Sequence, residues 1–187
     1  MAGATIGNTE QVVMGAGKWY LKPYTSGEIN LEEIAAPENL LGYTQGGATV
    51  TYTPETYTIE DDIGMIKRTF MVKADATMKT GLLTFDVKSL AALLSVGVVS
   101  QNEGNTKNIL KLGGGRAELK RFMVVFEYEK DKAKSQYIRV GMIATNTAAL
   151  EFAFTKDKET VPDITFTADT NGVDDTILVI EEDVDAA

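Results

Sequence analysis

The 187-residue sequence contains no cysteine and no histidine. Without cysteine, the chain has no disulfide, no thiolate nucleophile and none of the usual ligands of structural zinc. Without histidine, it lacks the commonest general base and the imidazole ligand of many metal sites. Serine–histidine–aspartate and cysteine–histidine enzymes are therefore excluded for this chain alone, and only carboxylate or lysine chemistry remains open to it.

Long apolar runs and basic charge are also scarce. No run of 18 or more apolar residues occurs, so we expect no membrane insertion. The opening MAGATIGNTEQVV lacks the basic and apolar regions of a secretory signal. The 27 acidic and 18 basic residues give a net charge of −9, which argues against tight binding to a phosphate backbone. With 44% hydrophobic residues, the composition indicates a globular domain.

Alternation of side chains with a period of two is the dominant pattern and predicts strands. Ala48, Val50 and Tyr52 alternate with threonines, and we expect Pro54 to end that strand. The clearest pair is RFMVVFEYE and QYIRVGMIAT, joined by the charged linker KDKAKS. The predicted strands are 19–24, 48–53, 69–77, 82–85, 121–129, 136–145, 150–154, 164–168 and 176–180.

One helix is predicted, with Asp86 as N-cap, VKSLAALLSV as its body and Gly97 at its end. Residues 27–42 are expected to form a loop. The segments joining the strands do not resemble helical crossovers, so the sheet should be antiparallel. The predicted fold class is mainly β: an antiparallel β-sandwich or partly closed barrel with one short flanking helix and long loops. We expect a single domain over residues 1–187, with an N-terminal arm of about 1–14 and an acidic C-terminal tail of about 181–187.

Residues 55–67 are predicted to form an unusually long connection, and long ordered loops are often functional. The segment is rich in apolar side chains for a solvated loop. Two interpretations stay open: the loop folds back on its own core, or it contacts another subunit. The apolar residues concerned are Tyr57, Ile59, Ile63, Met65 and Ile66.

Two glycine-rich stretches, LGYTQGG and LKLGGGRAELKRF, invite comparison with phosphate-binding loops. A P-loop needs a lysine followed by a hydroxyl residue at the start of a helix, and both stretches lead into β segments instead. The dinucleotide fingerprint fails for the same reason. We therefore expect no nucleotide or other cofactor, and interpret LGYTQGG as the turn that begins the strand at residue 48.

Clusters of charge have simpler explanations than catalysis. Paired carboxylates suit glycoside hydrolysis or calcium binding, but adjacent acids on loops are more often solvated. The basic clusters lack the interleaved aromatic residues of a single-strand binder, and Trp19 is expected in the core or a subunit contact. The acidic clusters are 60–62, 174–175 and 181–185; the basic residues are Lys111, Arg116, Lys120, Arg121, Lys130, Lys132 and Lys134.

Three segments together carry a family resemblance: VVMGAGKWYL, ENLLGYTQGGATVTYTPETYTIEDDIGMIKR and LEFAFTKDKETVPDITFTAD. In them the chain resembles the major tail tube proteins of tailed bacteriophages and of phage-tail-like bacteriocins. The resemblance implies a β-sandwich or barrel whose subunits form rings, typically of six, that stack into a hollow tube for DNA or ions. It also implies partners among tail sheath, tape-measure and baseplate proteins, and a location in a virion tail or bacteriocin particle assembled in the bacterial cytoplasm.

The resemblance agrees with features inferred independently. A negative net charge suits a conduit that must not hold DNA, and missing catalytic residues suit a structural protein rather than an enzyme. The apolar set Tyr57, Ile59, Ile63, Met65 and Ile66 is then the expected subunit or ring interface. Two other hypotheses remain: a β-sandwich that recognises carbohydrate or another surface without forming tubes, and an enzyme that uses carboxylates.

Overall fold

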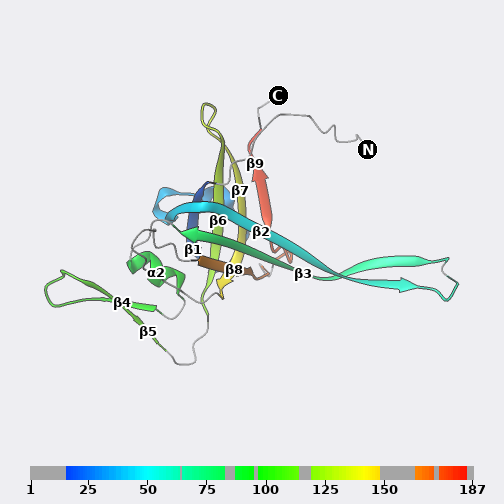
Figure 1. The fold of residues 1–187 in the computed structure, drawn as a ribbon, viewed down its shortest axis with the longest axis horizontal. Coiled ribbons are helices and arrows are strands. Elements are labelled where there is room, and N and C mark those ends of the chain that lie inside the picture. Colours follow the sequence, from blue (N-terminus) through cyan, green and yellow to red (C-terminus); the bar gives the residue numbers. More distant parts are fainter. Residues whose placement is uncertain are drawn as a thin grey trace.

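The computed structural model describes residues 16–63, 65–82, 87–94, 97–113, 119–147, 163–170 and 173–184. Strands dominate this part of the chain, joined by two short α-helices and one 3₁₀ helix (Figure 1). The elements are β1 (Lys18–Pro23), α1 (Leu31–Ile34), η1 (Pro37–Asn39), β2 (Leu40–Glu60), β3 (Lys67–Leu82), α2 (Val87–Leu93), β4 (Gly97–Gln101), β5 (Asn108–Leu112), β6 (Arg121–Asp131), β7 (Gln136–Asn146), β8 (Asp163–Ala168) and β9 (Val179–Glu182).

The main sheet is antiparallel throughout and closes on itself. Its strand order is β6-β1-β2-β3-β8-β7-β9, and β6 also pairs with β7, so the first six strands form a ring. β8 and β9 lie end to end along one edge of β7, which pairs with β8 at residues 144–146 and with β9 at residues 138–141. The predicted fold class, an antiparallel sandwich or partly closed barrel, is confirmed.

The core fills the ring of strands. Trp19 is fully buried, with its ring centroid 5.6 Å from that of Phe126 and 5.8 Å from that of Phe166. Alternate residues of β6 point inward because successive side chains of a strand point to opposite faces. The expectation that Trp19 lies in the core is confirmed. The buried members are Trp19, Leu21, Leu41, Met78, Leu82, Leu90, Leu93, Phe122, Val124, Phe126, Met142, Ala144, Ile164 and Phe166.

The predicted helix is present as α2 and contributes Leu90 and Leu93 to this core, but it ends at Leu93, and Gly97, its predicted end, is the first residue of β4. Its last turn is tied to the barrel because the side-chain amide of Asn146 donates to the Leu93 carbonyl at 3.0 Å. The predicted cap, Asp86, lies outside the described residues. Beside α2, β4 and β5 form a separate two-stranded hairpin that projects from the body (Figure 1).

The loop predicted over residues 27–42 is wrong, because α1 and η1 lie within it. Asn30 caps α1 by accepting a hydrogen bond from the Glu33 amide at 3.0 Å. Leu31 and Ile34 are buried on the outer face of the barrel against Tyr20 and Val125. This single turn of helix therefore closes a second, smaller core.

Three further predictions need correction. Pro54 does not end a strand, because β2 runs from Leu40 to Glu60; around Pro54 this strand pairs only with β3, and proline is tolerated on such an edge. LGYTQGG is not a turn but part of β2, where the register with β3 jumps between Gln45 and Ala48 and Gly47 adopts φ 83°. β4 (Gly97–Gln101) was missed, because Gly97 was expected to end the helix and residues 100–108 to form a loop.

Other predicted segments were placed nearly correctly or fall outside the described residues. β1, β6, β7 and β8 lie within about one or two residues of their predicted ranges, β9 overlaps the predicted strand 176–180, and β5 was not predicted. Of the predicted strand 82–85, Leu82 is the last residue of β3 and the rest lies outside the described residues, as does the strand 150–154. The predicted N-terminal arm is also outside them, whereas the first two residues of the predicted acidic tail, Glu181 and Glu182, belong to β9.

Candidate functional site: an exposed hairpin arm

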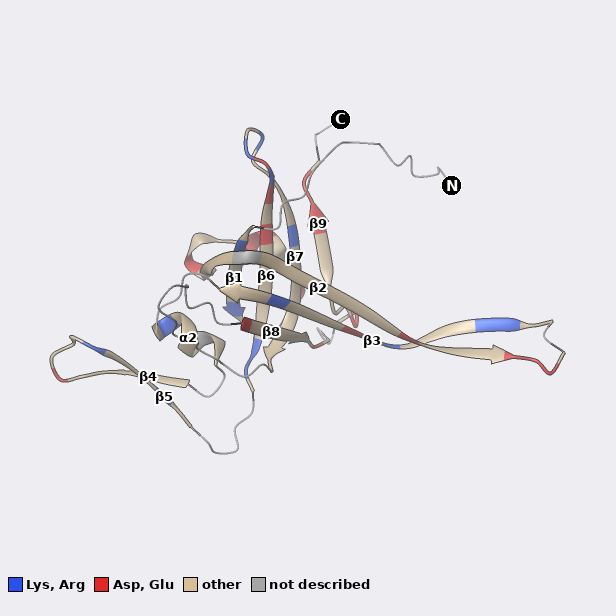
Figure 2. Ribbon diagram, in the orientation of Figure 1, with Lys and Arg blue, Asp and Glu red and all other residues tan. Residues whose placement is uncertain are grey.

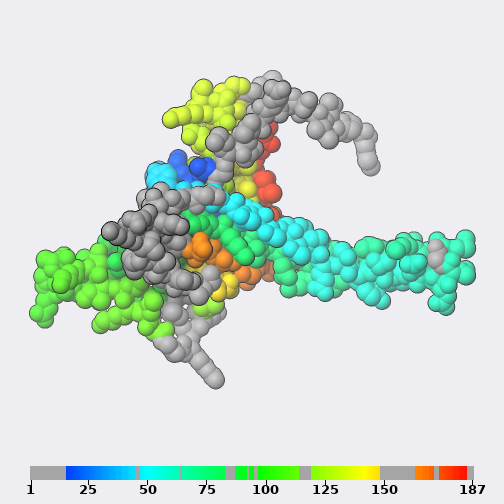
Figure 3. Space-filling view, viewed as in Figure 1, coloured from blue at the N-terminus to red at the C-terminus, as the bar shows by residue number. Residues whose placement is uncertain are grey.

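The most unusual feature is a two-stranded arm, residues 51–73, formed by the ends of β2 and β3 that run beyond the barrel (Figures 1 and 3). Residues 51–60 are all exposed, and so are residues 65–73. The sequence forms strands here because threonine, tyrosine and isoleucine fit an extended pleated backbone. The prediction of a long loop over residues 55–67 is therefore wrong, because β2 continues to Glu60 and β3 begins at Lys67.

The tip is fixed by its own hydrogen bonds. The backbone amide of Ile66 donates to the Asp61 carboxylate at 2.8 Å, and the amide of Asp61 donates to the Ile66 carbonyl at 3.1 Å. Just below, Lys67 and Glu60 form an ion pair at 3.4 Å. Aspartate at the turn and opposite charges at its base favour the hairpin.

The pairing register gives the arm two chemically different sides. Tyr57 lies opposite Phe70, and Ile59 lies opposite Arg68, so these four side chains share one side, here called the apolar side. On the other side, Thr58 lies opposite Thr69 with their hydroxyls 3.0 Å apart. This second side, the threonine side, comprises Thr56, Thr58, Glu60, Lys67, Thr69 and Met71.

The arm contains one bulge. Glu55 pairs with Lys73 and Thr56 pairs with Met71, which leaves Val72 without a partner in the register. The side chain of Val72 is 67% exposed. The bulge separates the part of the arm nearest the barrel from the part that carries the apolar side.

All five residues predicted as an interface lie at the far end of the arm. Ile63, Met65 and Ile66 occupy the tip, and Tyr57 and Ile59 lie on the apolar side. Their side chains are 59% (Tyr57), 52% (Ile59), 79% (Ile63), 82% (Met65) and 59% (Ile66) exposed. The interpretation that this segment folds back on its own core is therefore wrong.

Phe70 on the apolar side, Met71 on the threonine side and Val72 in the bulge are also exposed apolar residues of the arm, and they were not predicted as part of the site. The stretch TFMVKADAT was interpreted as an ordinary strand of the sheet. Three consecutive apolar residues break the alternation expected of a strand with one buried face, and this signal was available in the sequence.

A buried ionic cluster lies elsewhere, in the barrel wall between β1, β6 and β7. Glu127 is only 6% exposed and accepts hydrogen bonds from the Tyr20 hydroxyl at 3.1 Å and from Arg139 Nε at 3.0 Å. Arg139 also reaches Asp183 at 3.4 Å, which ties the segment after β9 to β7. Burial, followed by the negative charge of Glu127, raises the pKa of Tyr20 above its ordinary value. The cluster is satisfied internally, so its role is to hold the strands together.

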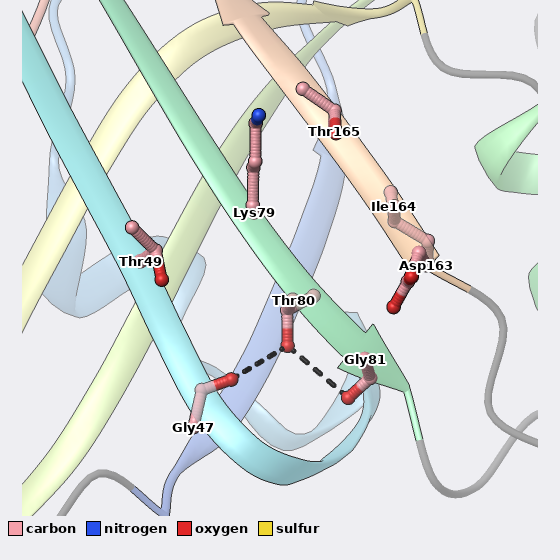
Figure 4. Close-up of a pocket in the computed structure, with 8 residues that line it drawn as sticks. All are labelled: Gly47, Thr49, Lys79, Thr80, Gly81, Asp163, Ile164 and Thr165. Atoms are coloured by element: carbon pink, nitrogen blue, oxygen red, sulfur yellow. Dashed lines mark hydrogen bonds between the residues drawn. The ribbon is translucent and has the colours of Figure 1, made fainter.

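A shallow hollow of about 390 Å³ lies on the outer wall where β2, β3 and β8 run side by side (Figure 4). Lys79 stands between Thr49 and Thr165, and the Thr80 hydroxyl donates to the carbonyls of Gly47 and Gly81, each at 3.2 Å. The hydrogen bonds of the Thr80 hydroxyl therefore stabilise the bulge at Gly47. The hollow offers no convergent set of reactive groups.

The charged clusters of the sequence are spread over the surface (Figure 2). Lys130, Lys132 and Lys134 lie at the β6–β7 hairpin, and Arg121 bonds to Asp169 and Thr170 near the end of β8. Among the described residues, no three carboxylates, histidines or cysteines are grouped to hold a metal ion. Within the same residues, no helix is long and apolar enough to cross a membrane.

No protein-family model matches the sequence, and no curated protein is similar to it. The geometry of the arm therefore carries the functional argument.

Proposed function

We propose that the protein is a structural subunit that assembles with copies of itself into rings, typically of six, stacked as a hollow tail tube. The observation that carries this proposal is the arm: it holds its apolar side chains away from the barrel that would otherwise bury them. The location that follows is a virion tail or a bacteriocin particle, assembled in the bacterial cytoplasm.

An isolated two-stranded ribbon is only marginally stable in water, because neither of its faces is covered. Continuous exposed apolar surface on a protein of this kind marks an interaction site. The arm is such a ribbon, and Tyr57, Phe70 and the three tip residues on it are all exposed. Contact with another subunit covers them, which supports assembly rather than a solitary domain.

The remaining surface suits a tube. A contact between the arm of one copy and the body of another joins two different surfaces, and such contacts repeat to give rings or stacks. The net charge of −9 disfavours adhesion of a passing DNA backbone. Tail sheath, tape-measure and baseplate proteins would then contact the outside, the lumen and the end of the tube.

The experiment is negative-stain electron microscopy of the purified full chain over a range of concentrations, with sedimentation velocity in parallel. We expect rings or hollow tubes that grow with concentration. A monodisperse monomer at every concentration and salt condition would contradict the proposal, and a melting temperature raised by a sugar would then favour the carbohydrate-binding alternative.

A further inference from the structure

A groove of about 600 Å³ lies at the base of the arm, where it meets the segment that leads into β9. It is mostly apolar, and part of its lining is the bulge and the residues beside it. Tyr52, Met71 and Val72 are 48%, 62% and 67% exposed, and the Tyr52 hydroxyl donates to the Met71 sulfur at 3.6 Å. The apolar lining residues are Tyr52, Met71, Val72, Ala74, Ile177 and Leu178.

The chemistry of the groove favours apolar side chains as its occupant. Small-molecule sites hold a few convergent polar groups that orient the ligand. Here the charged residues among the lining, Lys73 and Asp175, are both exposed, and Lys73 already pairs with Asp75 at 2.7 Å. The apolar wall between them is therefore suited to a protein segment rather than to a charged ligand.

The arm is poorly suited to adding a strand along its edges. Pro54 removes a hydrogen-bond donor from β2, and the bulge at Val72 interrupts β3. Proline and bulges on edge strands are devices that prevent edge-to-edge pairing. The arm therefore permits contacts through its side chains but not through backbone pairing along its edges.

We infer that the groove receives the tip of the arm of a second copy of the chain, so that Ile63, Met65 and Ile66 pack against its apolar wall. This inference rests on the proposed assembly and names the surface that accepts the arm. About nine strand residues separate Tyr52 from the tip, which corresponds to roughly 30 Å. A tip held that far from its own groove reaches only the groove of another molecule.

The size of the surface agrees with a second copy as the occupant. Six side chains at the far end of the arm, Tyr57, Ile59, Ile63, Met65, Ile66 and Phe70, are between 49% and 82% exposed. The two aromatic residues among them account for roughly 150–250 Å² each when fully buried. One partner contributes about 800 Å² to a standard protein interface, so the tip and the apolar side together offer a surface of the order that one partner contributes.

The absence of native cysteine allows a direct test by cross-linking in the full chain. Met65→Cys places one thiol at the tip and Ile177→Cys places the other in the groove. Under mild oxidation the double variant is expected to give a ladder of disulfide-linked multimers on a denaturing gel. The control pair, Met65→Cys with Val98→Cys, has its second thiol on the exposed β4 strand and should cross-link at least tenfold more slowly.

Equal rates for the two pairs would overturn the inference, as would assembled tubes that give no ladder through Ile177→Cys. If tubes assemble but give no ladder through Ile177→Cys, the proposed function stands and only the groove assignment is wrong. If the unmodified chain does not assemble at all, the proposed function itself is wrong. A second variant, Val72→Glu, puts a charge into the groove at an exposed position. It should raise the concentration needed for assembly at least tenfold, and unchanged assembly would again overturn the inference.

Discussion

Tyr57 on β2 lies directly opposite Phe70 on β3, and both aromatic side chains are about half exposed although they face each other across the arm. Cross-strand aromatic pairs stabilise a hairpin by about 0.2–1 kcal/mol. This stabilisation is small, and the pair still leaves much of both aromatic side chains in contact with water. We therefore interpret the pair as part of a contact between subunits rather than as a feature that stabilises the monomer.

Replacing both residues, Tyr57→Ser with Phe70→Ser, should weaken assembly at least tenfold, which corresponds to about 1.4 kcal/mol per tenfold change. The barrel keeps its core, so thermal unfolding of the monomer should change little. Sedimentation velocity gives the assembly constant. The matched control is Thr58→Ala with Thr69→Ala on the threonine side, which should assemble nearly as the wild type does; the opposite ranking would contradict the assignment of the two sides.

Glu127→Ala should destabilise the protein by about 3 kcal/mol, because it removes the nearer carboxylate partner of the largely buried Arg139 and the acceptor of Tyr20. For a chain of this size, that corresponds to a fall in melting temperature of about 6–12 °C. Calorimetry is the measurement. Glu33→Ala, which removes an exposed partner of Lys22, should leave the melting temperature nearly unchanged, and similar effects of the two substitutions would rule out a special role for burial.

The raised pKa of Tyr20 predicts a loss of stability in alkali. Below pH 10 the phenol is protonated in both the folded and the unfolded chain, so it adds no pH dependence. Above pH 10 the unfolded chain releases the proton while the folded chain keeps it, and the free energy of unfolding falls by up to about 1.4 kcal/mol per pH unit. Urea unfolding at pH 8, 10 and 11 should show a shallower decline for Tyr20→Phe than for the wild type; parallel declines would contradict the prediction.

Gly17 is expected to tolerate no side chain. A Cβ atom there would lie 2.5 Å from the Glu127 carbonyl oxygen and would also strike the ring of Phe126. Gly17→Ala should therefore cost about 1–3 kcal/mol in urea unfolding. Gly113→Ala is the control, since no atom lies within 4 Å of its added Cβ, and it should stay within about 0.5 kcal/mol of the wild type. A neutral Gly17→Ala would show that β1 and β6 can separate at this point.

The elements predicted best are those whose pattern is repeated over many residues. β6 and β7 are each eleven residues long and rich in β-branched and aromatic residues, and α2 carries a stripe of apolar residues at helical spacing. α1 was missed because its four residues are too few for periodicity, although Asn30 followed by Glu33 is an N-cap signature. The cluster around Glu127 could not be predicted, because Tyr20 lies 107 residues away in the sequence.

The arm shows how a local rule can mislead. The rule that proline ends a strand predicts a stop at Pro54, yet proline ends a strand only where a neighbouring strand needs the missing donor. Beyond Pro54 the residues Thr56, Thr58 and Glu60 continue to alternate with Tyr57 and Ile59, so the sequence did carry the strand signal. The five predicted interface residues still fall together, because they are close in sequence. What no local pattern indicated is that the arm leaves the barrel altogether.

The most direct test of the account removes the far part of the arm in register. Residues 56–72 are replaced by Asn-Gly, a two-residue turn, so that Glu55 still pairs with Lys73. The described side chains among residues 56–72 are all exposed or partly exposed, so their removal takes nothing from the core. The variant should therefore fold and melt close to the wild-type temperature. By sedimentation velocity and electron microscopy, the wild type should form rings or tubes and the variant should remain a monomer; a folded variant that assembles like the wild type would contradict the central claim.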